Sequence, residues 1–232
     1  MSEPEKIRLN KRLVQLGFVN SRRAGDELIS SGKVRVGGKT INNLATTVTS
    51  NNIVSVTGRG AKFHDSGLVV ALNKPVGYIC SHAQQGDSPT IFSLLPRNFA
   101  HLKIAGRLDK DSSGLVILSS DGDLVQKLSH PSTQKPKEYV VGLDKPLAAG
   151  DQKRLVMGVK LNDGISKFDS LSKITSTRWR LSLHEGRNRQ IRRTLADLGY
   201  TVKVLERVSL GGLSLSNLGT GKHKIIKPNE VL

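Results

Sequence analysis

The sequence predicts a two-domain α+β protein, and three features of the 232-residue chain indicate it. Two short helical periods followed by short strand patterns fill roughly the first 60 residues. Residues 57–67 then contain several glycines and few apolar side chains, which is typical of a linker. From Leu68 onward, continuous apolar runs typical of buried strands alternate with short helical segments. We therefore expect a small domain at residues 1–62 and a larger domain at residues 66–232.

The first domain is expected to hold two helices and a small sheet. Leucines at positions 9, 13 and 16 recur at helical spacing, and Gly17 follows as a stop signal. Ser21 is a suitable N-cap for a second helix, which is expected to end at Gly32. Strands are predicted at residues 34–36, 40–41 and 53–56, with a Gly-Gly turn between the first two.

The second domain is expected to be built around a sheet. Uninterrupted apolar residues predict buried strands at 68–72 and 114–120, and residues 73–77 are expected to form a loop. Further strands are predicted at 78–80, 139–141, 167–174, 178–183, 202–205 and 208–215. Short helices are predicted at 91–95 and after Asp121-Gly122, and a stronger helix at Arg189–Leu198, where Gly199 stops it.

The charge balance indicates a polyanionic partner. The chain has 36 Lys+Arg against 19 Asp+Glu, a net charge of +17, while its 37% hydrophobic content is that of a folded protein. Residues 1–65 hold 11 Lys+Arg and 5 Asp+Glu, a balance of +6, which leaves +11 for the rest. Both domains are therefore expected to contact the same nucleic acid or acidic surface.

Several classes of site are not expected. Cys80 is the single cysteine, so neither an internal disulfide nor a cysteine-based zinc site can form. The six histidines show no i, i+4 pair, so the sequence predicts no metal site. No apolar stretch is long enough to span a membrane and the first residues lack the apolar core of a signal peptide, so we expect a cytoplasmic protein.

Basic residues crowd the first domain. Seven fall within 28 residues: Arg8, Lys11, Arg12, Arg22, Arg23, Lys33 and Arg35. They could form a solvated basic face or contact RNA phosphates. Residues 7 to about 59 resemble the S4 RNA-binding domain, through the leucine-rich first helix, the segment 20–24 and the segment 29–38. The resemblance implies binding to structured RNA through its shape and phosphates.

A carboxylate flanked by cations is the first candidate for chemistry. Asp109 lies in the segment Gly106–Leu115, between Arg107 and Lys110 and just before a predicted strand. Nearby positive charge keeps a carboxylate ionised, and an ionised, positioned carboxylate can act as a nucleophile. Asp109 could instead form a turn, or share a cation site with Asp111 and the aspartates at 121 and 123. A calcium loop would need a closing glutamate, which the segment lacks.

The segment Glu185–Arg193 is the second candidate. At 100° per residue, apolar side chains at 191, 195 and 198 share one face of the predicted helix, and Arg189, Arg192 and Arg193 share the opposite face. Three guanidinium groups on one face could bind phosphates, or could bind a carboxylate through two hydrogen bonds. A solvated helix face is the alternative.

Four ordered motifs now resemble one family. They are Gly106–Leu115, Lys137-Glu138-Tyr139, Glu185–Arg193 and 204–208, preceded by the opening segment 71–77. In this order behind an S4-like domain, they resemble the RsuA/RluB/RluE/RluF family of ribosomal RNA pseudouridine synthases. The resemblance covers nearly the whole chain. It implies a catalytic domain with a mixed, largely antiparallel sheet, which isomerises uridine to pseudouridine without metal or organic cofactor. Nothing in the sequence requires more than a monomer.

The resemblance also implies roles for single residues. Asp109 would be the catalytic aspartate, and Arg192 would pair with it and compensate its burial. Tyr139 would pack against the target uracil, and Leu205 would form an apolar wall of the pocket. Tyr139 could instead be an ordinary strand tyrosine, and Leu205 an ordinary core leucine.

Further cations are expected to contact the RNA. Arg107 would fill the space that a flipped-out uridine leaves, and Arg189 and Arg193 would contact phosphates. The segments 106–112 and 71–77 look closer to the RluB and RluF members of the family, a resemblance that favours large-subunit (23S) over small-subunit (16S) ribosomal RNA. The expected partner is ribosomal RNA or a ribosomal assembly intermediate. A transfer RNA substrate or a non-catalytic S4-type RNA-binding module is the alternative. An S4-linked methyltransferase would need a glycine-rich cofactor loop, for which Asp121-Gly122-Asp123 is a poor substitute.

Overall fold

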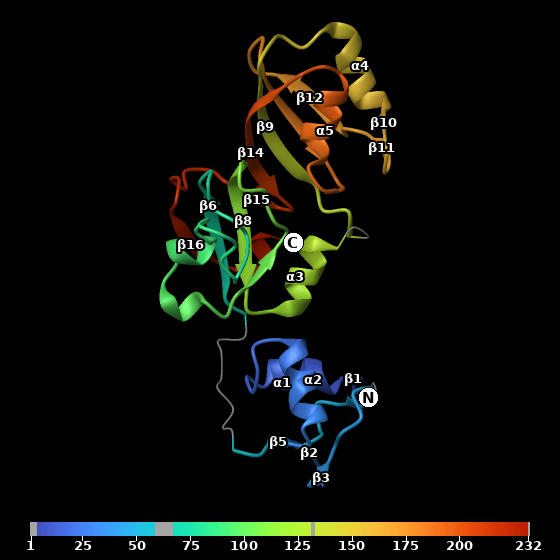
Figure 1. Ribbon diagram of the computed structural model, residues 1–232, viewed down its shortest axis with the longest axis vertical. Coiled ribbons are helices and arrows are strands. Elements are labelled where there is room, and N and C mark those ends of the chain that lie inside the picture. The colour runs from blue at the N-terminus through green and yellow to red at the C-terminus, as the bar shows by residue number, and fades with distance from the viewer. Residues whose placement is uncertain (1–3, 59–66, 131–132, 232) are drawn as a thin grey trace. The chain divides into compact units, whose positions relative to one another are not determined.

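The chain folds into two compact units, Met1–Ser66 and Gly67–Leu232 (Figure 1). The computed structural model describes residues 4–58, 67–130 and 133–231. Residues 59–66 of the predicted linker, and with them both predicted domain boundaries, lie outside the described residues.

The described part of the first unit, residues 4–58, holds two helices and two small sheets. Its elements are β1 (Ile7–Arg8), α1 (Leu9–Gln15), α2 (Arg22–Ser30), β2 (Val34–Val36), β3 (Lys39–Thr40), β4 (Thr47–Val48) and β5 (Val54–Val56). The strands form the sheet β3-β2-β5 and the separate pair β1-β4, all antiparallel. The predicted helices and the main sheet are confirmed, whereas the pair β1-β4 was not predicted because each strand has only two residues.

Leucines and one glycine join the two helices. Leu9 and Leu13 of α1 and Ile29 of α2 are fully buried, as the helical spacing predicts. The hydroxyl of Ser21 accepts a hydrogen bond from the N–H of Ala24 at 3.1 Å, so Ser21 is the predicted N-cap. A Cβ at Gly25 would lie 3.2 Å from the backbone of Asn10, so the absence of a side chain lets α2 pack closely on α1.

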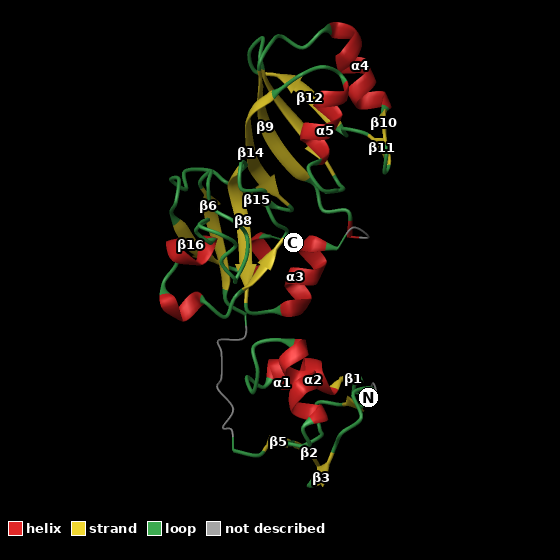
Figure 2. Cartoon of the chain, viewed as in Figure 1, coloured by secondary structure: helices red, strands yellow, loops and turns green. Residues whose placement is uncertain are grey.

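The second unit is a mixed α+β domain around one large sheet (Figure 2). Its strands are β6 (Val69–Lys74), β7 (Lys103–Ala105), β8 (Ser113–Ser119), β9 (Lys137–Leu143), β10 (Val159–Leu161), β11 (Gly164–Ser166), β12 (Ser170–Lys173), β13 (Arg178–Leu183), β14 (Val202–Leu210), β15 (Leu213–Ser214) and β16 (His223–Ile226). Its helices are α3 (Gly122–Ser129), α4 (Ala149–Met157) and α5 (Gln190–Asp197), with 3-10 turns η1 (Ile91–Leu94), η2 (Arg97–Phe99) and η4 (Pro228–Glu230). The sheet order is β12-β13-β9-β14-β8-β6-β16, and among the described pairings of these strands only β14-β8 is parallel.

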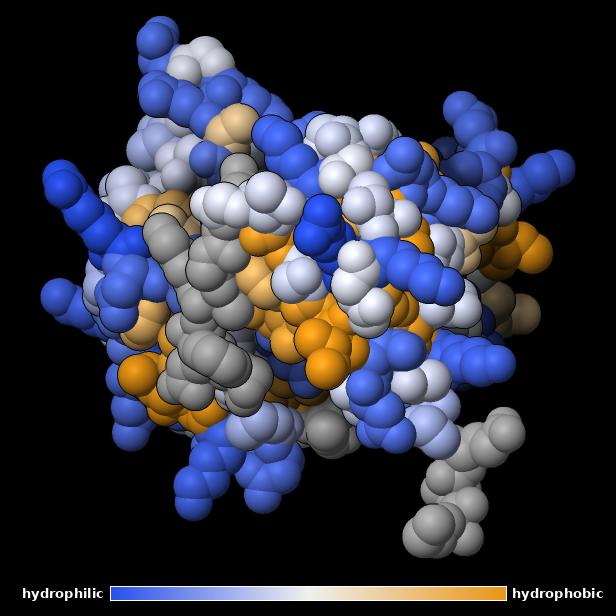
Figure 3. Space-filling model, turned by 90° about the horizontal axis from the view of Figure 1, so that it is seen from below, coloured by the Kyte–Doolittle hydropathy of each residue, from blue (hydrophilic) through white to orange (hydrophobic). Residues whose placement is uncertain are grey.

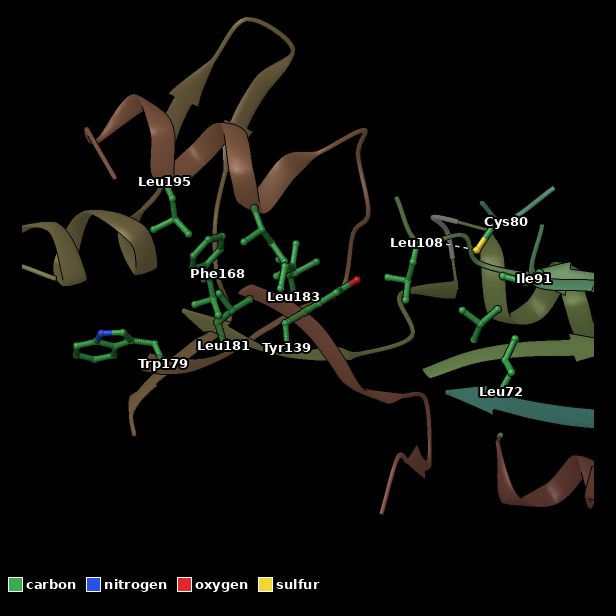
Figure 4. Packing of buried hydrophobic residues seen from close by; sticks show 14 of the residues in the cluster. Leu72, Cys80, Ile91, Leu108, Tyr139, Phe168, Trp179, Leu181, Leu183 and Leu195 are labelled. Carbon is green, nitrogen blue, oxygen red and sulfur yellow. Dashed lines mark hydrogen bonds between the residues drawn. The ribbon is translucent and has the colours of Figure 1, made fainter. Parts of the chain in front are cut away.

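Alternate residues of the central strands serve two apolar clusters. On one face, Val70 and Leu72 of β6 belong to the larger cluster, which also holds Phe168 and Trp179 and is drawn in part in Figure 4. On the other face, Val69 of β6 joins a cluster that packs against α3. Because both faces are covered, β6 and β8 are almost entirely buried, as their uninterrupted apolar sequence predicts.

The parallel pair β14-β8 depends on Gly114. This residue has φ +105°, and a Cβ on it would lie 2.2 Å from the backbone oxygen of Arg207. A side chain would therefore force the strands apart. The contact joins the segment that carries Asp109 to the strand that carries Leu205 and Arg207.

Several elements differ from the sequence prediction. Residues 78–80 form only an isolated bridge between Ile79 and Thr90, and residues 202–215 form the bulged strand β14 followed by β15. Lys74 lies inside β6, whereas a loop was predicted there. The elements β7, α4, β10, β11 and β16 were not predicted. Among the described residues of α4, only Leu155 is buried, so the helix lacks the repeated apolar residues from which it could have been predicted.

The surface is mainly hydrophilic. Figure 3 shows one face of the molecule, on which hydrophilic side chains prevail and some apolar ones are exposed. Within the described ranges, no helix has the length and apolar character needed to cross a membrane.

Candidate active site

A pocket of about 670 Å³ in the second unit collects the residues of the predicted motifs. Asp109, Tyr139, Leu205, Arg107 and Arg189 all line it. Arg192 and Arg193 are not among its lining residues. The pocket thus brings together three of the four expected catalytic side chains and two of the expected RNA contacts.

Asp109 lies on the loop between β7 and β8 and is accessible from the pocket. Its side chain is 36% exposed, so the expected burial is wrong. The nearest guanidinium nitrogen, Nη1 of Arg189, lies 3.7 Å from Oδ2 of Asp109. Within the part of the chain that the structure describes, no residue donates a hydrogen bond to the Asp109 carboxylate. Asp109 therefore presents its oxygens to the pocket.

Arg189 and Asp111 form a pair with two hydrogen bonds. Nη1 and Nη2 of Arg189 donate to Oδ1 and Oδ2 of Asp111 at 3.1 and 2.8 Å. These bonds hold the pKa of the Asp111 carboxyl below its usual value and raise the pKa of Arg189. Arg189 has a left-handed backbone, φ 48° and ψ 30°, directly before α5. Such a backbone is costly for a residue other than glycine, and here it turns the guanidinium toward the loop of Asp109 and Asp111.

Arg192 pairs with Asp111, so the expected pair with Asp109 is wrong. Its Nε lies 3.3 Å from Oδ2 of Asp111, and its Nη2 donates to the backbone oxygen of Asp111 at 2.8 Å. Its Nη1 donates to the backbone oxygen of Val202 at 3.0 Å. Arg192 lies within α5 and bonds to Val202 of β14. Its side chain therefore reaches the Asp109 loop at the backbone of Asp111 and not at the carboxylate of Asp109. Arg189, at the start of the helix, lies nearer Asp109.

Two other arginines of the same segment bind Asp163. Arg193 donates two hydrogen bonds to the Asp163 carboxylate, at 3.0 and 2.7 Å, and Arg187 donates to Oδ1 of Asp163 at 3.1 Å. Asp163 lies in the turn between β10 and β11. The four arginines therefore diverge from the head of α5 toward two aspartates, so the predicted common face of Arg189, Arg192 and Arg193 is wrong.

Tyr139 and Leu205 come from neighbouring strands. Tyr139 of β9 lies opposite Arg207 of β14, two residues beyond Leu205, and both Tyr139 and Leu205 are 7% exposed. Figure 4 shows the Tyr139 hydroxyl directed away from Leu181 and Phe168, toward the side on which Leu108 lies. The pair therefore gives the pocket an aromatic and an apolar wall.

Two buried cations under the Asp109 loop were missed by sequence reasoning. Arg207 is 1% exposed and donates to the backbone oxygens of Leu115 and Gly106, at 2.8 and 3.1 Å. Lys74 is fully buried and donates to the backbone oxygen of Ser112 at 2.6 Å, and burial lowers its pKa. Arg207 thus ties the first residue of the loop, Gly106, to β8, and Lys74 holds the last residue of the loop, Ser112. For Lys74, the available signal was a charged residue at the end of a strand that is otherwise mostly apolar.

Positive charge dominates the pocket wall. Besides Arg107, Arg189 and Arg207, the lining includes Lys110, Lys137 and Arg187, whereas Asp109 is the one carboxylate among the described lining residues. Lys137 donates to the backbone oxygen of His184 at 2.8 Å, and burial lowers its pKa. Such a pocket suits a polyanionic ligand that presents a neutral ring to the apolar wall.

Comparison with known proteins agrees with this geometry. Residues 68–197 match the family described as RNA pseudouridylate synthase, and residues 7–54 match the S4 domain. The chain belongs to the RNA pseudouridine synthase family. It is an isomerase of the RsuA/RluF type with an N-terminal S4 domain, and the predicted fold class is confirmed.

Pseudouridine synthases from several organisms are similar along nearly the whole chain. An uncharacterized RNA pseudouridine synthase of Mycobacterium bovis is 36% identical, over 99% of this chain and 93% of that protein. The dual-specificity RNA pseudouridine synthase RluF of Escherichia coli K12 is 33% identical, over 100% and 79%. The chloroplastic putative ribosomal large subunit pseudouridine synthase SVR1 of Arabidopsis thaliana is 37% identical, over 97% and 59%. A crystal structure of a pseudouridylate synthase matches with a TM-score of 0.71 and 26% identity, over 97% of this chain and 98% of that one.

The S4 domain of this pseudouridine synthase keeps most of its cations accessible. Arg8, Arg22, Arg23, Lys33 and Arg35 are exposed, and Lys11 and Arg12 are partly buried. Arg12 donates to the backbone oxygen of Ser50 at 3.3 Å. The exposed guanidinium groups are therefore available to phosphates.

Proposed function

We propose that this pseudouridine synthase isomerises a uridine in ribosomal RNA, with Asp109 as its catalytic carboxylate. The observation that supports this most is the pocket, where Asp109 is the one carboxylate among the described lining residues and accepts no hydrogen bond from them. Opposite charge surrounds it, and Tyr139 and Leu205 supply a wall that a pyrimidine ring can contact.

The reaction needs one carboxylate and no redox partner. The bond between N1 of the base and C1′ of the sugar breaks, the base turns, and C5 bonds to C1′. C5 loses its proton and N1 gains one, so atoms and electrons balance. Asp109 can attack C1′ or C6, or can remove a proton in an elimination route. Each route requires a free carboxylate oxygen at the pocket.

A uridine in folded RNA must leave its stack to reach Asp109. Tyr139 offers the extruded base an aromatic surface, and Leu205 excludes water beside it. Arg107, exposed at the pocket, lies two residues before Asp109 and can take the place of the base in the RNA. The remaining cations of the pocket wall are suited to the phosphates next to the target.

The RNA substrate is proposed from the named relatives and the S4 domain. The name of SVR1 is putative ribosomal large subunit pseudouridine synthase, and that of RluF is dual-specificity RNA pseudouridine synthase. We therefore favour large-subunit ribosomal RNA, bound through the exposed S4 cations. Mapping pseudouridines in ribosomal and transfer RNA from cells with and without this protein tests the substrate. Loss of a site in transfer RNA alone would overturn the ribosomal assignment.

Asp109→Asn tests the catalytic role. The amide keeps the shape of the side chain and removes its charge, so single-turnover isomerisation of ribosomal RNA should fall below detection while the RNA dissociation constant changes little. Asp197→Asn makes the same chemical change at an exposed position of the same domain and should retain the wild-type rate. An Asp109→Asn rate within about tenfold of wild type, worth about 1.4 kcal/mol of barrier, would remove Asp109 from the mechanism.

A further inference from the structure

Asp111 lies two residues after Asp109 and binds both arginines that face the loop from α5. We infer that Asp111 is a positioning residue, which occupies the guanidinium of Arg189 and so keeps the Asp109 carboxylate free to react. The inference rests on the proposed catalytic role of Asp109. It concerns a residue that makes none of the contacts with uridine proposed above.

The distances show an unequal division of Arg189 between two carboxylates. Arg189 donates two hydrogen bonds to Asp111, at 3.1 and 2.8 Å, but its Nη1 lies 3.7 Å from Asp109. Oδ2 of Asp111 also lies 3.3 Å from Nε of Arg192, an ion pair without a hydrogen bond that places a second positive charge beside the Asp111 carboxylate. The backbone of Asp111 is held as well, because Nη2 of Arg192 donates to its oxygen at 2.8 Å.

This division has a chemical consequence. A guanidinium that binds a carboxylate through two parallel hydrogen bonds occupies both of its oxygens. A carboxylate held in that way is a poor nucleophile and a poor base, because its lone pairs are engaged. With Asp111 in place, Arg189 supplies positive charge beside Asp109 while its hydrogen bonds go elsewhere.

The other charged groups around Asp109 do not replace this arrangement. Lys74, beneath the loop on β6, interacts electrostatically with both Asp109 and Asp111, but its ammonium is bonded to backbone oxygens. The further titratable groups of the pocket wall are Cys80, Arg107, Lys110, Lys137, Tyr139, His184, Arg187 and Arg207. None of these, among the described contacts, donates a hydrogen bond to Asp109. Without the Asp111 charge, Asp109 becomes the nearest carboxylate to Arg189.

Asp111→Asn tests the inference through the pH dependence of the single-turnover rate. Arg189 should move onto Asp109, so the rate near neutral pH should fall about 10- to 100-fold. The acidic limb of the profile should move to lower pH, by on the order of one unit, because a closer guanidinium stabilises the ionised carboxylate. Asp111→Glu, which keeps the charge, should recover part of the rate and return the limb toward its wild-type position.

Asp163→Asn is the matched control, because Asp163 forms the corresponding two-bond pair with Arg193, in the first turn of α5. It should leave the acidic limb in place. A limb that is unchanged or moved to higher pH in Asp111→Asn, or moved equally in Asp163→Asn, would overturn the positioning role. Asp109→Asn in the same assay separates the two proposals: if it stays active, the proposed function fails, and if it is inactive while Asp111→Asn keeps the wild-type profile, only this inference fails.

Discussion

The arginines of the S4 domain are free of ion pairs in the described contacts, whereas those of the segment Glu185–Arg193 are paired with aspartates. In the S4 domain, Arg22 and Arg23 are exposed, and no described carboxylate pairs with them. In the second segment, all four arginines bind aspartates, two at Asp111 and two at Asp163. Both segments are rich in arginine at helical spacing, so their sequence patterns alone do not distinguish them.

The difference separates affinity from geometry. An exposed guanidinium can exchange counterions for RNA phosphates, which supplies affinity that depends on salt. A guanidinium bonded to an aspartate and to backbone oxygens instead fixes the position of a loop. We therefore expect substitutions in the S4 domain to change binding, and substitutions at the head of α5 to change the reaction rate.

Among the substitutions that test this difference, Arg192→Ala should have the largest effect on stability and on the reaction rate. It removes the hydrogen bonds to the backbone oxygens of Asp111 and Val202 and leaves Asp111 without one of its two cations. The side chain is only 14% exposed, so we expect a loss of about 2–4 kcal/mol in the free energy of unfolding. The single-turnover rate should fall about 100-fold or more through displacement of the Asp109 loop, while RNA affinity largely persists.

Chemical denaturation and single-turnover assays on the same preparation test this expectation. Arg154→Ala removes an arginine whose side chain is 59% exposed and pairs with Asp151 within α4, so it controls for the loss of one ion pair. If Arg192→Ala weakened RNA binding and kept the wild-type rate at saturating RNA, the geometric role of the α5 arginines would be refuted.

The double substitution Arg22→Ala and Arg23→Ala should have the next largest effect. Loss of two phosphate contacts should weaken RNA binding roughly 10- to 100-fold near 0.1 M salt. The slope of log affinity against log salt should flatten by about one unit for each lost contact. The rate at saturating RNA should stay close to wild type, because Asp109 and Tyr139 belong to the other unit.

Binding titrations at several salt concentrations measure that slope. Glu27→Ala changes one charge of opposite sign at an exposed position of the same helix, and it should not flatten the salt dependence. A double variant that binds like wild type but reacts slowly would contradict the assignment of affinity to the S4 domain.

The local sequence pattern predicted helices and strands better than it predicted which charged side chains pair with one another. The strand Arg178–Leu183 was predicted with the observed bounds, and the helix after Arg189 within one residue at each end, because apolar periodicity is a property of neighbouring residues. The partner of Arg189 lies 78 residues earlier in the chain, and only the fold brings the two together. The pairing of Arg192 was wrong for the same reason. The family resemblance named the residues but paired Arg192 with Asp109, whereas in the structure Arg192 pairs with Asp111, two residues further along the chain.

The smallest effect that we expect is the change in stability with pH that the buried Lys74 produces. Burial lowers its pKa from 10.5, so between the lowered value and 10.5 the unfolded chain binds more protons than the folded chain. The free energy of unfolding of the wild type, relative to Lys74→Met, should therefore rise with pH up to about 10.5 and then level off. The fluorescence of Trp179, the single tryptophan, follows unfolding of the domain that contains Lys74. Lys33→Met removes the same charge from an exposed side chain of the S4 domain and corrects for the change in net charge. A relative stability that stays level or falls with rising pH would show that the ammonium of Lys74 is not disfavoured under the Asp109 loop.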